Sequence, residues 1–283
     1  MTKKLLLLST GGTIASVVSD EGLAPGESGE ELIKMLGRLE YDITVRDILE
    51  LDSSNIQPEE WKIIAEAIYD HRNEYDGIVV SHGTDTMAYT ASMLTFMLQH
   101  INIPVVLTGS QVPMNVILSD APDNLRLAFA AAANCEPGVY IAFNRKVIRG
   151  CRSVKVRTTA FDAFESVNVP PVGEVTSDGF SIRDHRHPQP GKSQLNTKID
   201  THVSLVKLFP GFDPALLHAM AKNGCHGIVI EAYGLGGMTS IRRNMVAAVG
   251  ELIRNGIPII TSSQCLYERS DLTKYEVGRL ALL

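Results

Sequence analysis

The stretch Leu5-Leu6-Leu7-Leu8-Ser9-Thr10-Gly11-Gly12-Thr13 sets the pattern of this chain. A short, continuous apolar run comes first, and a loop of glycine and hydroxyl residues follows it. The same order recurs at Gly77–Ser81 and at Pro104–Leu107, where each apolar run leads through a polar loop into a helical pattern. Continuous apolar runs that alternate with helices are typical of a parallel sheet covered on both faces.

The pattern changes in the second half of the chain. Val139–Phe143 and Val147–Val156 indicate a hairpin that turns at Asn144-Arg145. Residues 183–201 are polar and rich in Pro, Gly, Gln and His, which is typical of a linker. Beyond them, residues 203–261 return to a β-α-β-α-β pattern.

These patterns predict an α/β fold class. We expect a larger N-terminal, mostly parallel sheet with helices on both faces, linked to a smaller C-terminal α/β domain. The expected boundaries are residues 1–185 for an N-terminal catalytic domain, 186–202 for the linker and 203–283 for the smaller domain.

Composition narrows the class of protein. The 283 residues are 45% apolar and 20% charged, as in a globular protein, and the net charge of −6 comes without a long basic block. We therefore expect no nucleic-acid partner. Four leucines are fewer than the roughly 7 to 15 apolar residues of a secretion signal or the ~18 of a membrane span. The chain should be cytoplasmic and should not bind a membrane.

The four cysteines, at positions 135, 151, 225 and 265, are scattered and form no C-x-x-C pair. This spacing fits reduced thiols in the cytosol better than a disulfide framework or a zinc site. We expect no metal ion and no cofactor.

The loops after the apolar runs are the first candidates for a functional site, because ligands of parallel sheets bind beyond the carboxyl ends of the strands. In Ser9–Thr13 the glycines either only reverse the chain or allow Thr13 to project its hydroxyl. In Ser81–Met87, Thr84 and Asp85 could cap a helix or contact a ligand. Thr108–Gln111 is, taken alone, a polar turn. The residues by themselves leave these alternatives open.

Lys155 stands between Val154 and Val156 in an apparent strand. Alternation would direct its side chain away from the two apolar neighbours, which usually means toward solvent. A partly buried lysine could instead serve as a base.

Taken together, five segments resemble the bacterial-type L-asparaginases, especially their cytoplasmic type I branch. They are TGGTIAS (10–16), DSSN (52–55), HGTDTM (82–87), TGS (108–110) and GCRSVKV (150–156). The order and spacing match as far as about Tyr275. The resemblance implies hydrolysis of L-asparagine to L-aspartate and ammonia by a threonine nucleophile, through a β-aspartyl-enzyme. The alternatives are a glutaminase-asparaginase of broader specificity, a catalytically impaired amino-acid-binding homologue, or a subunit that makes amidated tRNA.

The resemblance also implies roles for individual residues. The catalytic residues would be Thr13 as nucleophile, with Thr84, Asp85 and Lys155 polarising hydroxyl and water. The substrate-binding residues would be Asp52, Ser53, Ser54 and Asn55 on the α-carboxylate, and Ser110 through its backbone carbonyl on the leaving amide. Asp85 would also accept the α-ammonium group. A buried, structural imidazole is the expectation for His82.

The chain departs from the family pattern at two places. Leu23 stands about where many members carry a tyrosine in the mobile segment after the nucleophile. The apolar end, Val277–Leu283, comes earlier than the end of most members, so we expect an incomplete small domain whose edge a partner chain could cover. The family forms intimate dimers, which implies a homodimer or a dimer of dimers here, with Tyr233–Gly237 as the loop that completes the partner's site. Cys265 falls near the place of a regulatory asparagine site.

Overall fold

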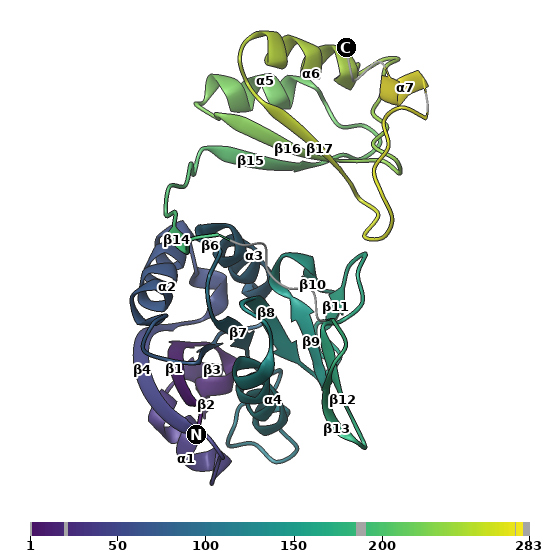
Figure 1. Ribbon diagram of the computed structural model, residues 1–283. Coiled ribbons are helices and arrows are strands. Elements are labelled where there is room, and N and C mark those ends of the chain that lie inside the picture. The colour runs from purple at the N-terminus through teal and green to yellow at the C-terminus, as the bar shows by residue number, and fades with distance from the viewer. Residues whose placement is uncertain (1, 20–21, 185–190, 275, 280–283) are drawn as a thin grey trace. The chain divides into compact units, whose positions relative to one another are not determined.

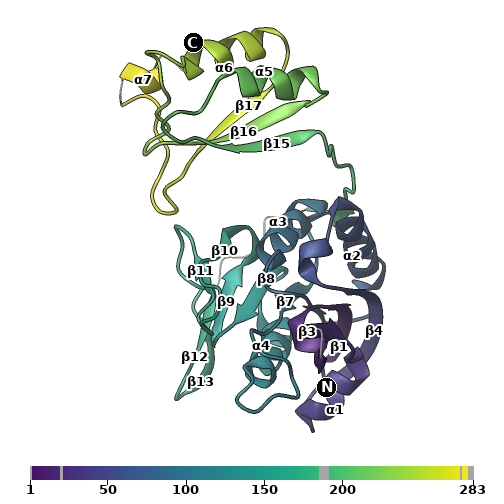
Figure 2. The same ribbon diagram turned by 180° about the vertical axis from the view of Figure 1, so that it is seen from behind.

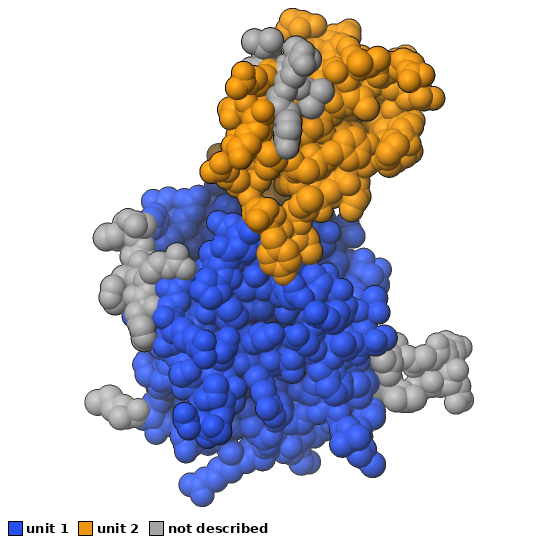
Figure 3. All heavy atoms as spheres, turned by 90° about the vertical axis from the view of Figure 1, so that its right-hand side faces the viewer, with its two compact units in different colours: residues 1–197 blue, residues 198–283 orange. Residues whose placement is uncertain are grey.

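The computed structural model describes residues 2–19, 22–184, 191–274 and 276–279 (Figure 1). The chain divides into two compact units, Met1–Thr197 and Lys198–Leu283, which Figure 3 colours blue and orange. Each unit has its own sheet and its own apolar core. Within the described residues, no helix is both long enough and apolar enough to cross a membrane.

Unit 1 is built on an eight-stranded sheet with the spatial order β13-β12-β9-β8-β7-β5-β1-β4 (Figure 1). The five neighbouring strands β8, β7, β5, β1 and β4 run parallel to one another. The other three strands, β9, β12 and β13, extend the sheet beyond β8 through antiparallel pairings. Their bounds are β1 Lys4–Gly11, β4 Asp42–Leu51, β5 Gly77–Ser81, β7 Pro104–Thr108, β8 Gly138–Phe143, β9 Lys146–Arg149, β12 Gly173–Thr176 and β13 Gly179–Ile182. The expected mostly parallel sheet is confirmed.

Helices cover both faces of this sheet (Figures 1 and 2). They are α1 Gly29–Leu36, α2 Pro58–His71, α3 Met87–Met97 and α4 Ala121–Asn134. Leu5 and Leu7 of β1 share one apolar cluster with α1 and α4. Leu6 and Leu8 are equally buried but alternate to the other face, where α2 and α3 lie. The four leucines are therefore a strand buried on both faces.

Local chain chemistry sets the ends of α1. The Ser28 side chain and the Glu31 side chain form a reciprocal capping box at the start of the helix. Helix α1 ends at Leu36. Gly37 follows with φ of 74°, in the left-handed region that glycine adopts at little cost.

The expected hairpin after β8 is only partly correct. Strand β9 ends at Arg149, Gly150–Arg152 forms a 3-10 turn, and β10 Ser153–Lys155 pairs with β11 Phe164–Ser166 in a separate sheet. The chain leaves the main sheet at Gly150, where an added Cβ would come within 2.9 Å of the Ala91 carbonyl oxygen of α3. This close approach to α3 carries Lys155 away from β9.

Two short pairings complete unit 1. Strands β2 Ser16–Ser19 and β3 Gly22–Pro25 pair in antiparallel fashion. Strand β14 Gln194–Leu195 pairs with β6 Leu98–Gln99, so this part of the expected linker 186–202 belongs to unit 1. Residues 186–190 of that linker lie outside the described residues.

Unit 2 contains the parallel sheet β15-β16-β17 with α5 and α6 packed on one side of it (Figure 1). The elements are β15 Val203–Lys207, α5 Ala215–Lys222, β16 Gly227–Ala232, α6 Met245–Arg254, β17 Ile259–Ser263 and α7 Glu276–Arg279. The β-α-β-α-β order follows the sequence pattern. Helix α6 starts at Met245, where the Asn244 side chain caps it by accepting from the Ala247 N–H.

His82, directly after β5, is fully buried in a chain of hydrogen bonds between elements. Trp61 Nε1 donates to Thr90 Oγ1 at 3.0 Å, the Thr90 hydroxyl donates to His82 Nε2 at 2.9 Å, and His82 Nδ1 donates to the Gly83 carbonyl at 2.7 Å. This order of donors requires a neutral ring. Burial lowers the pKa of His82 to about 4, so the imidazole is a structural link between α2, α3 and the loop after β5.

The close packing of β5 on α4 generates a stability prediction. A Cβ added at Gly77 would lie 2.1 Å from the Ala132 carbonyl oxygen, which cannot rotate away. Gly77→Ala should therefore lower the free energy of unfolding by roughly 1–3 kcal/mol, measured by urea denaturation. The matched control is Gly250→Ala in α6, where the nearest atom is the flexible end of Arg254 at 3.4 Å. That change should stabilise by about 0.5–1 kcal/mol. A Gly77→Ala midpoint at or above wild type would contradict the packing.

The buried His82 predicts a stability loss in mild acid. Its folded pKa of about 4 lies below the ordinary value of 6.5, so the unfolded chain binds the extra proton first. The stabilisation is complete above pH 6.5 and is lost as pH falls toward 4, by roughly 3 kcal/mol. Urea denaturation between pH 4 and 7 should show a steeper loss for wild type than for His82→Gln, whose amide does not titrate. Parallel curves would contradict the neutral, buried ring.

Candidate active site

The carboxyl ends of β1, β5 and β7 lie in one row. Ser9 pairs with Ser81, and Ser81 pairs with Thr108, across neighbouring parallel strands. The loops that follow these strands therefore leave the sheet at the same edge. Two of these loops and the segment after β4 carry most of the predicted site residues.

Glycines bring the first two loops into backbone contact. Gly12 has φ of 81°, and an added Cβ there would lie 2.3 Å from the Gly83 backbone nitrogen. The Gly12 N–H also donates to the Leu51 carbonyl at 3.0 Å, which joins the end of β4 to the same place. Thr13 follows Gly12 as the partly exposed first residue of a 3-10 turn, and Thr84 follows Gly83. The structure therefore brings the Thr13 loop against the Thr84 loop.

Lys155 joins two other predicted residues. Its Nζ donates to Thr84 Oγ1 at 2.8 Å and to Asp85 Oδ1 at 2.7 Å. The Lys155 side chain is only 17% exposed and Thr84 is buried, whereas the Asp85 side chain is 64% exposed. Lys155 thus points into the protein, not to solvent as simple alternation suggested. The ammonium group orients the Thr84 hydroxyl so that its lone proton is directed elsewhere.

Gln111 accepts a hydrogen bond from the Thr84 hydroxyl. The residue type of Gln111 alone did not predict this contact. Thr84 Oγ1 donates to Gln111 Oε1 at 3.3 Å, while Gln111 Nε2 donates to the carbonyls of Thr158 and Ala160 at 3.0 and 3.1 Å. The amide is therefore held in one orientation from the segment after β10. In the sequence, only the position of Gln111 directly after Thr108–Ser110 could have indicated that it lies in the site.

The segment after β4 packs against the Thr84 loop. The Thr86 hydroxyl donates to the Ser53 carbonyl at 2.7 Å, and a Cβ added at Gly83 would lie 2.5 Å from Ser53 Oγ. The Asp52 carboxylate accepts from the Ser54 backbone N–H at 2.8 Å and from the Ser54 hydroxyl. Ser53 is therefore buried in the contact, whereas Asp52, Ser54 and Asn55 are exposed.

Ser110 is fully buried, and its hydroxyl donates to the Val112 carbonyl at 2.6 Å. Its side chain is thus committed to its own turn, and only its backbone can serve a ligand. The neighbouring Gly109 lies against the His82 carbonyl, and its own carbonyl accepts from Asn124 Nδ2 of α4 at 2.9 Å. This loop is held from two sides.

A second residue that the sequence did not indicate is Glu27. It lines a cavity of about 230 Å³ together with Gly11 and Ala15, which flank the Thr13 turn. Its Oε2 is buried and has no hydrogen-bond partner among the described residues, and burial raises the pKa of this carboxyl. Nothing in its polar, glycine-rich surroundings distinguished Glu27 in the sequence.

Comparison with known proteins identifies the family to which this chain is related. The chain matches the model of the asparaginase N-terminal domain over residues 4–188 and that of the glutaminase/asparaginase C-terminal domain over residues 202–282. The L-asparaginase of Thermococcus kodakarensis is 43% identical over 99% of this chain and 85% of its own length, and its solved structure superposes with a TM-score of 0.93.

Two further similarities extend this comparison. A glutamyl-tRNA(Gln) amidotransferase subunit of Methanopyrus kandleri is 36% identical over 97% of this chain and 64% of that protein. The solved structure of the probable cytoplasmic L-asparaginase from Campylobacter jejuni is 28% identical, covers 93% of this chain and 84% of that one, and gives a TM-score of 0.80. Because both family models match and together span most of the sequence, this chain belongs to the asparaginase family.

Proposed function

We propose that this chain hydrolyses L-asparagine to L-aspartate and ammonia, with Thr13 as the nucleophile. One observation carries the proposal: Lys155 of β10 donates to Thr84 and Asp85 on the loop whose Gly83 packs directly against Gly12, the residue before Thr13. Membership of the asparaginase family supports the choice of substrate class.

In the first half of the reaction, Thr13 Oγ attacks the carbon of the side-chain amide. A carbon–oxygen bond forms, and the carbonyl oxygen becomes an oxyanion that needs hydrogen-bond donors. The hydroxyl proton passes to the amide nitrogen, the carbon–nitrogen bond breaks, and ammonia leaves. A β-aspartyl ester on Thr13 remains.

In the second half, a water molecule attacks the ester. Thr84, whose hydroxyl is oriented by Lys155 and Gln111, would hold that water or relay its proton. The ester bond breaks, a proton returns to Thr13 Oγ, and aspartate is released. Lys155 and Thr84 are the only relay that the matched motifs supply.

Substrate charge agrees with the remaining site residues. The exposed carboxylate of Asp85 suits an α-ammonium group. The exposed side chain of Asn55 would donate to the α-carboxylate, and Ser54 would join it by turning its hydroxyl away from Asp52, to which it donates in this structure. The buried Ser53 fixes that segment against Thr86. The Ser110 backbone carbonyl would accept from the leaving amide. Unit 1, including the expected catalytic domain 1–185, holds all of these groups.

A second candidate rests on the relatives named as subunits of glutamyl-tRNA(Gln) amidotransferase. Such a chain would release ammonia for tRNA amidation. Higher identity to the L-asparaginase, 43% against 36%, favours turnover of the free amino acid. Within that activity, one extra methylene is worth only about 1–3 kcal/mol, so a broader glutaminase-asparaginase is the nearest alternative.

The setting of the enzyme is part of the proposal. We infer a cytoplasmic protein, as the name of the Campylobacter jejuni relative states for that protein. We also infer that it takes a small-molecule substrate and has no nucleic-acid or membrane partner. Family resemblance implies a homodimer or a dimer of dimers, which a native mass measurement would check.

Removal of the proposed nucleophile should abolish activity. Purified full-length chain should release ammonia from free L-asparagine without tRNA, and faster than from L-glutamine. Thr13→Ala should lower kcat by at least roughly 10⁴-fold with little change in thermal stability, because the hydroxyl that forms the ester is gone. Thr13→Ser keeps a hydroxyl and should retain part of the rate. Near-normal turnover by Thr13→Ala would reject this nucleophile, and no release by wild type would favour an impaired binding homologue.

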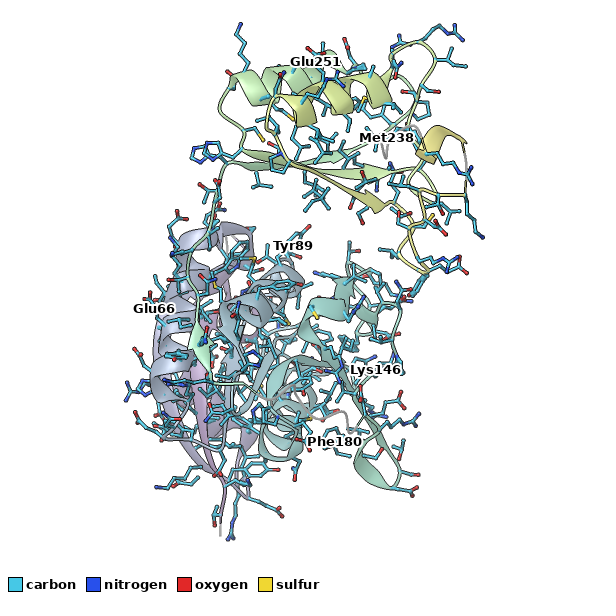
Figure 4. The ribbon with its side chains drawn as sticks, turned by 45° about the horizontal axis from the view of Figure 1, so that its top comes forward. Glu66, Tyr89, Lys146, Phe180, Met238 and Glu251 are labelled. Carbon is cyan, nitrogen blue, oxygen red and sulfur yellow. The ribbon has the colours of Figure 1, made fainter. Side chains whose placement is uncertain are left out.

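Replacement of Lys155 should lower activity, whereas replacement of a lysine outside the site should not. Lys155→Met removes the donor to Thr84 and should reduce kcat by roughly 10²- to 10⁴-fold. The matched control is Lys146→Met on β9, labelled in Figure 4, whose Nζ lies 2.9 Å from Asp162 outside the site. That control should stay close to the wild-type rate. Equal losses in both variants would contradict a role for Lys155 in the chemistry.

A further inference from the structure

Unit 2 brings two histidines together at the amino ends of its strands. His202 and His226 directly precede Val203 and Gly227, which pair across β15 and β16. The His226 N–H donates to the His202 carbonyl at 2.7 Å, so the ladder extends by one residue. Neighbouring strands are about 4.8 Å apart, and the two ring centroids are 4.8 Å apart. The register of the sheet therefore fixes the histidine pair.

Asp200 adds a carboxylate to the pair. Its Oδ1 accepts from the His202 backbone N–H at 2.9 Å, which holds the side chain in place. Its Oδ2 is 2.8 Å from His226 Nδ1, and its Oδ1 is 3.5 Å from His202 Nδ1. One ligand atom from each of the three residues lies within 4.8 Å of the others. All three side chains are exposed, so an ion and its waters can reach them.

We propose that Asp200, His202 and His226 bind one divalent transition-metal ion of the Zn²⁺ type. Two imidazole nitrogens and one carboxylate oxygen are ligands that suit Zn²⁺, Co²⁺, Ni²⁺ or Cu²⁺, whereas Ca²⁺ and Mg²⁺ prefer oxygen alone. Zinc bonds of about 2.0–2.2 Å place tetrahedral ligand atoms roughly 3.3–3.5 Å apart. The present spacing of 2.8 to at most 4.8 Å reaches that geometry by side-chain rotation, with water in the open position.

The metal would stabilise unit 2 and take no part in the amide chemistry. It would connect the chain at Asp200 to both β15 and β16, and so close a loop that includes α5. The loop Tyr233–Gly237, which the family resemblance assigns to a partner's site, follows the carboxyl end of β16. It therefore lies at the opposite end of that strand from His226. A ligand that binds only the folded state raises stability in proportion to the logarithm of its concentration over Kd.

The test is titration of the untagged full-length chain with Co²⁺ and with Zn²⁺ alone, followed by calorimetry and thermal unfolding. The wild-type protein should bind one ion per chain, and its Tm should rise with metal concentration. With Co²⁺ it should show the visible absorption bands that nitrogen and oxygen ligands produce. His202→Ala and His226→Asn should each weaken binding by at least roughly tenfold. Asp200→Asn, which keeps the side-chain shape, should weaken it as well.

The matched control is His218→Ala, which removes another exposed histidine of unit 2. His218 lies 3.8 Å from Glu251 of α6, labelled in Figure 4, and outside the cluster. Its Co²⁺ affinity should equal that of wild type. Absence of binding to wild type, or binding that survives in the cluster variants, would overturn the proposal. A thiolate-to-cobalt charge-transfer band would do the same, because it would assign the ion to exposed Cys151 or Cys265.

Discussion

The site depends on the backbone contact between the loop after β1 and the loop after β5. Parallel pairing of Ser9 with Ser81 ends both strands at the same level, and Gly12 then packs on Gly83 with no room for a side chain. A Cβ at Gly12 would push against the Gly83 backbone and separate the two loops, and a Cβ at Gly83 would push against Ser53 in the segment after β4. This contact brings the loop that carries Thr13 next to the cluster of Thr84, Asp85 and Lys155, and the proposed amide hydrolysis requires such proximity between its nucleophile and its proton relay.

Polar groups at this edge are supported by neighbours from several elements. Lys155 comes from the small β10-β11 sheet, Gln111 from the loop after β7, and Ser53 from the segment after β4, and each contacts the loop after β5. His82 anchors the base of the same loop through α2 and α3. Buried polar groups supported in this way keep one arrangement, which favours a preorganised site.

The two units have similar architecture but gather different side chains at the ends of their strands. Both contain parallel strands packed against helices, and in both the register of adjacent parallel strands sets which side chains meet. In unit 1 the carboxyl ends of the strands gather hydroxyls, a carboxylate and a lysine. In unit 2 the amino ends gather two imidazoles and a carboxylate. The first set suits amide chemistry, and the second suits metal binding.

The sequence by itself determined the α/β class, the parallel core and the loops that carry Thr13, Thr84 and Asp85, because continuous apolar runs and glycine loops are local signals. The helix end at Gly37 needed the φ of that glycine. The break after Arg149, the inward direction of Lys155, the contact of Gln111 with Thr84 and the burial of the Glu27 carboxyl oxygen were decided only in three dimensions. Each depends on contacts between segments far apart in the chain, such as Gly150 on α3 or Gln111 on Thr84, which no local pattern encodes.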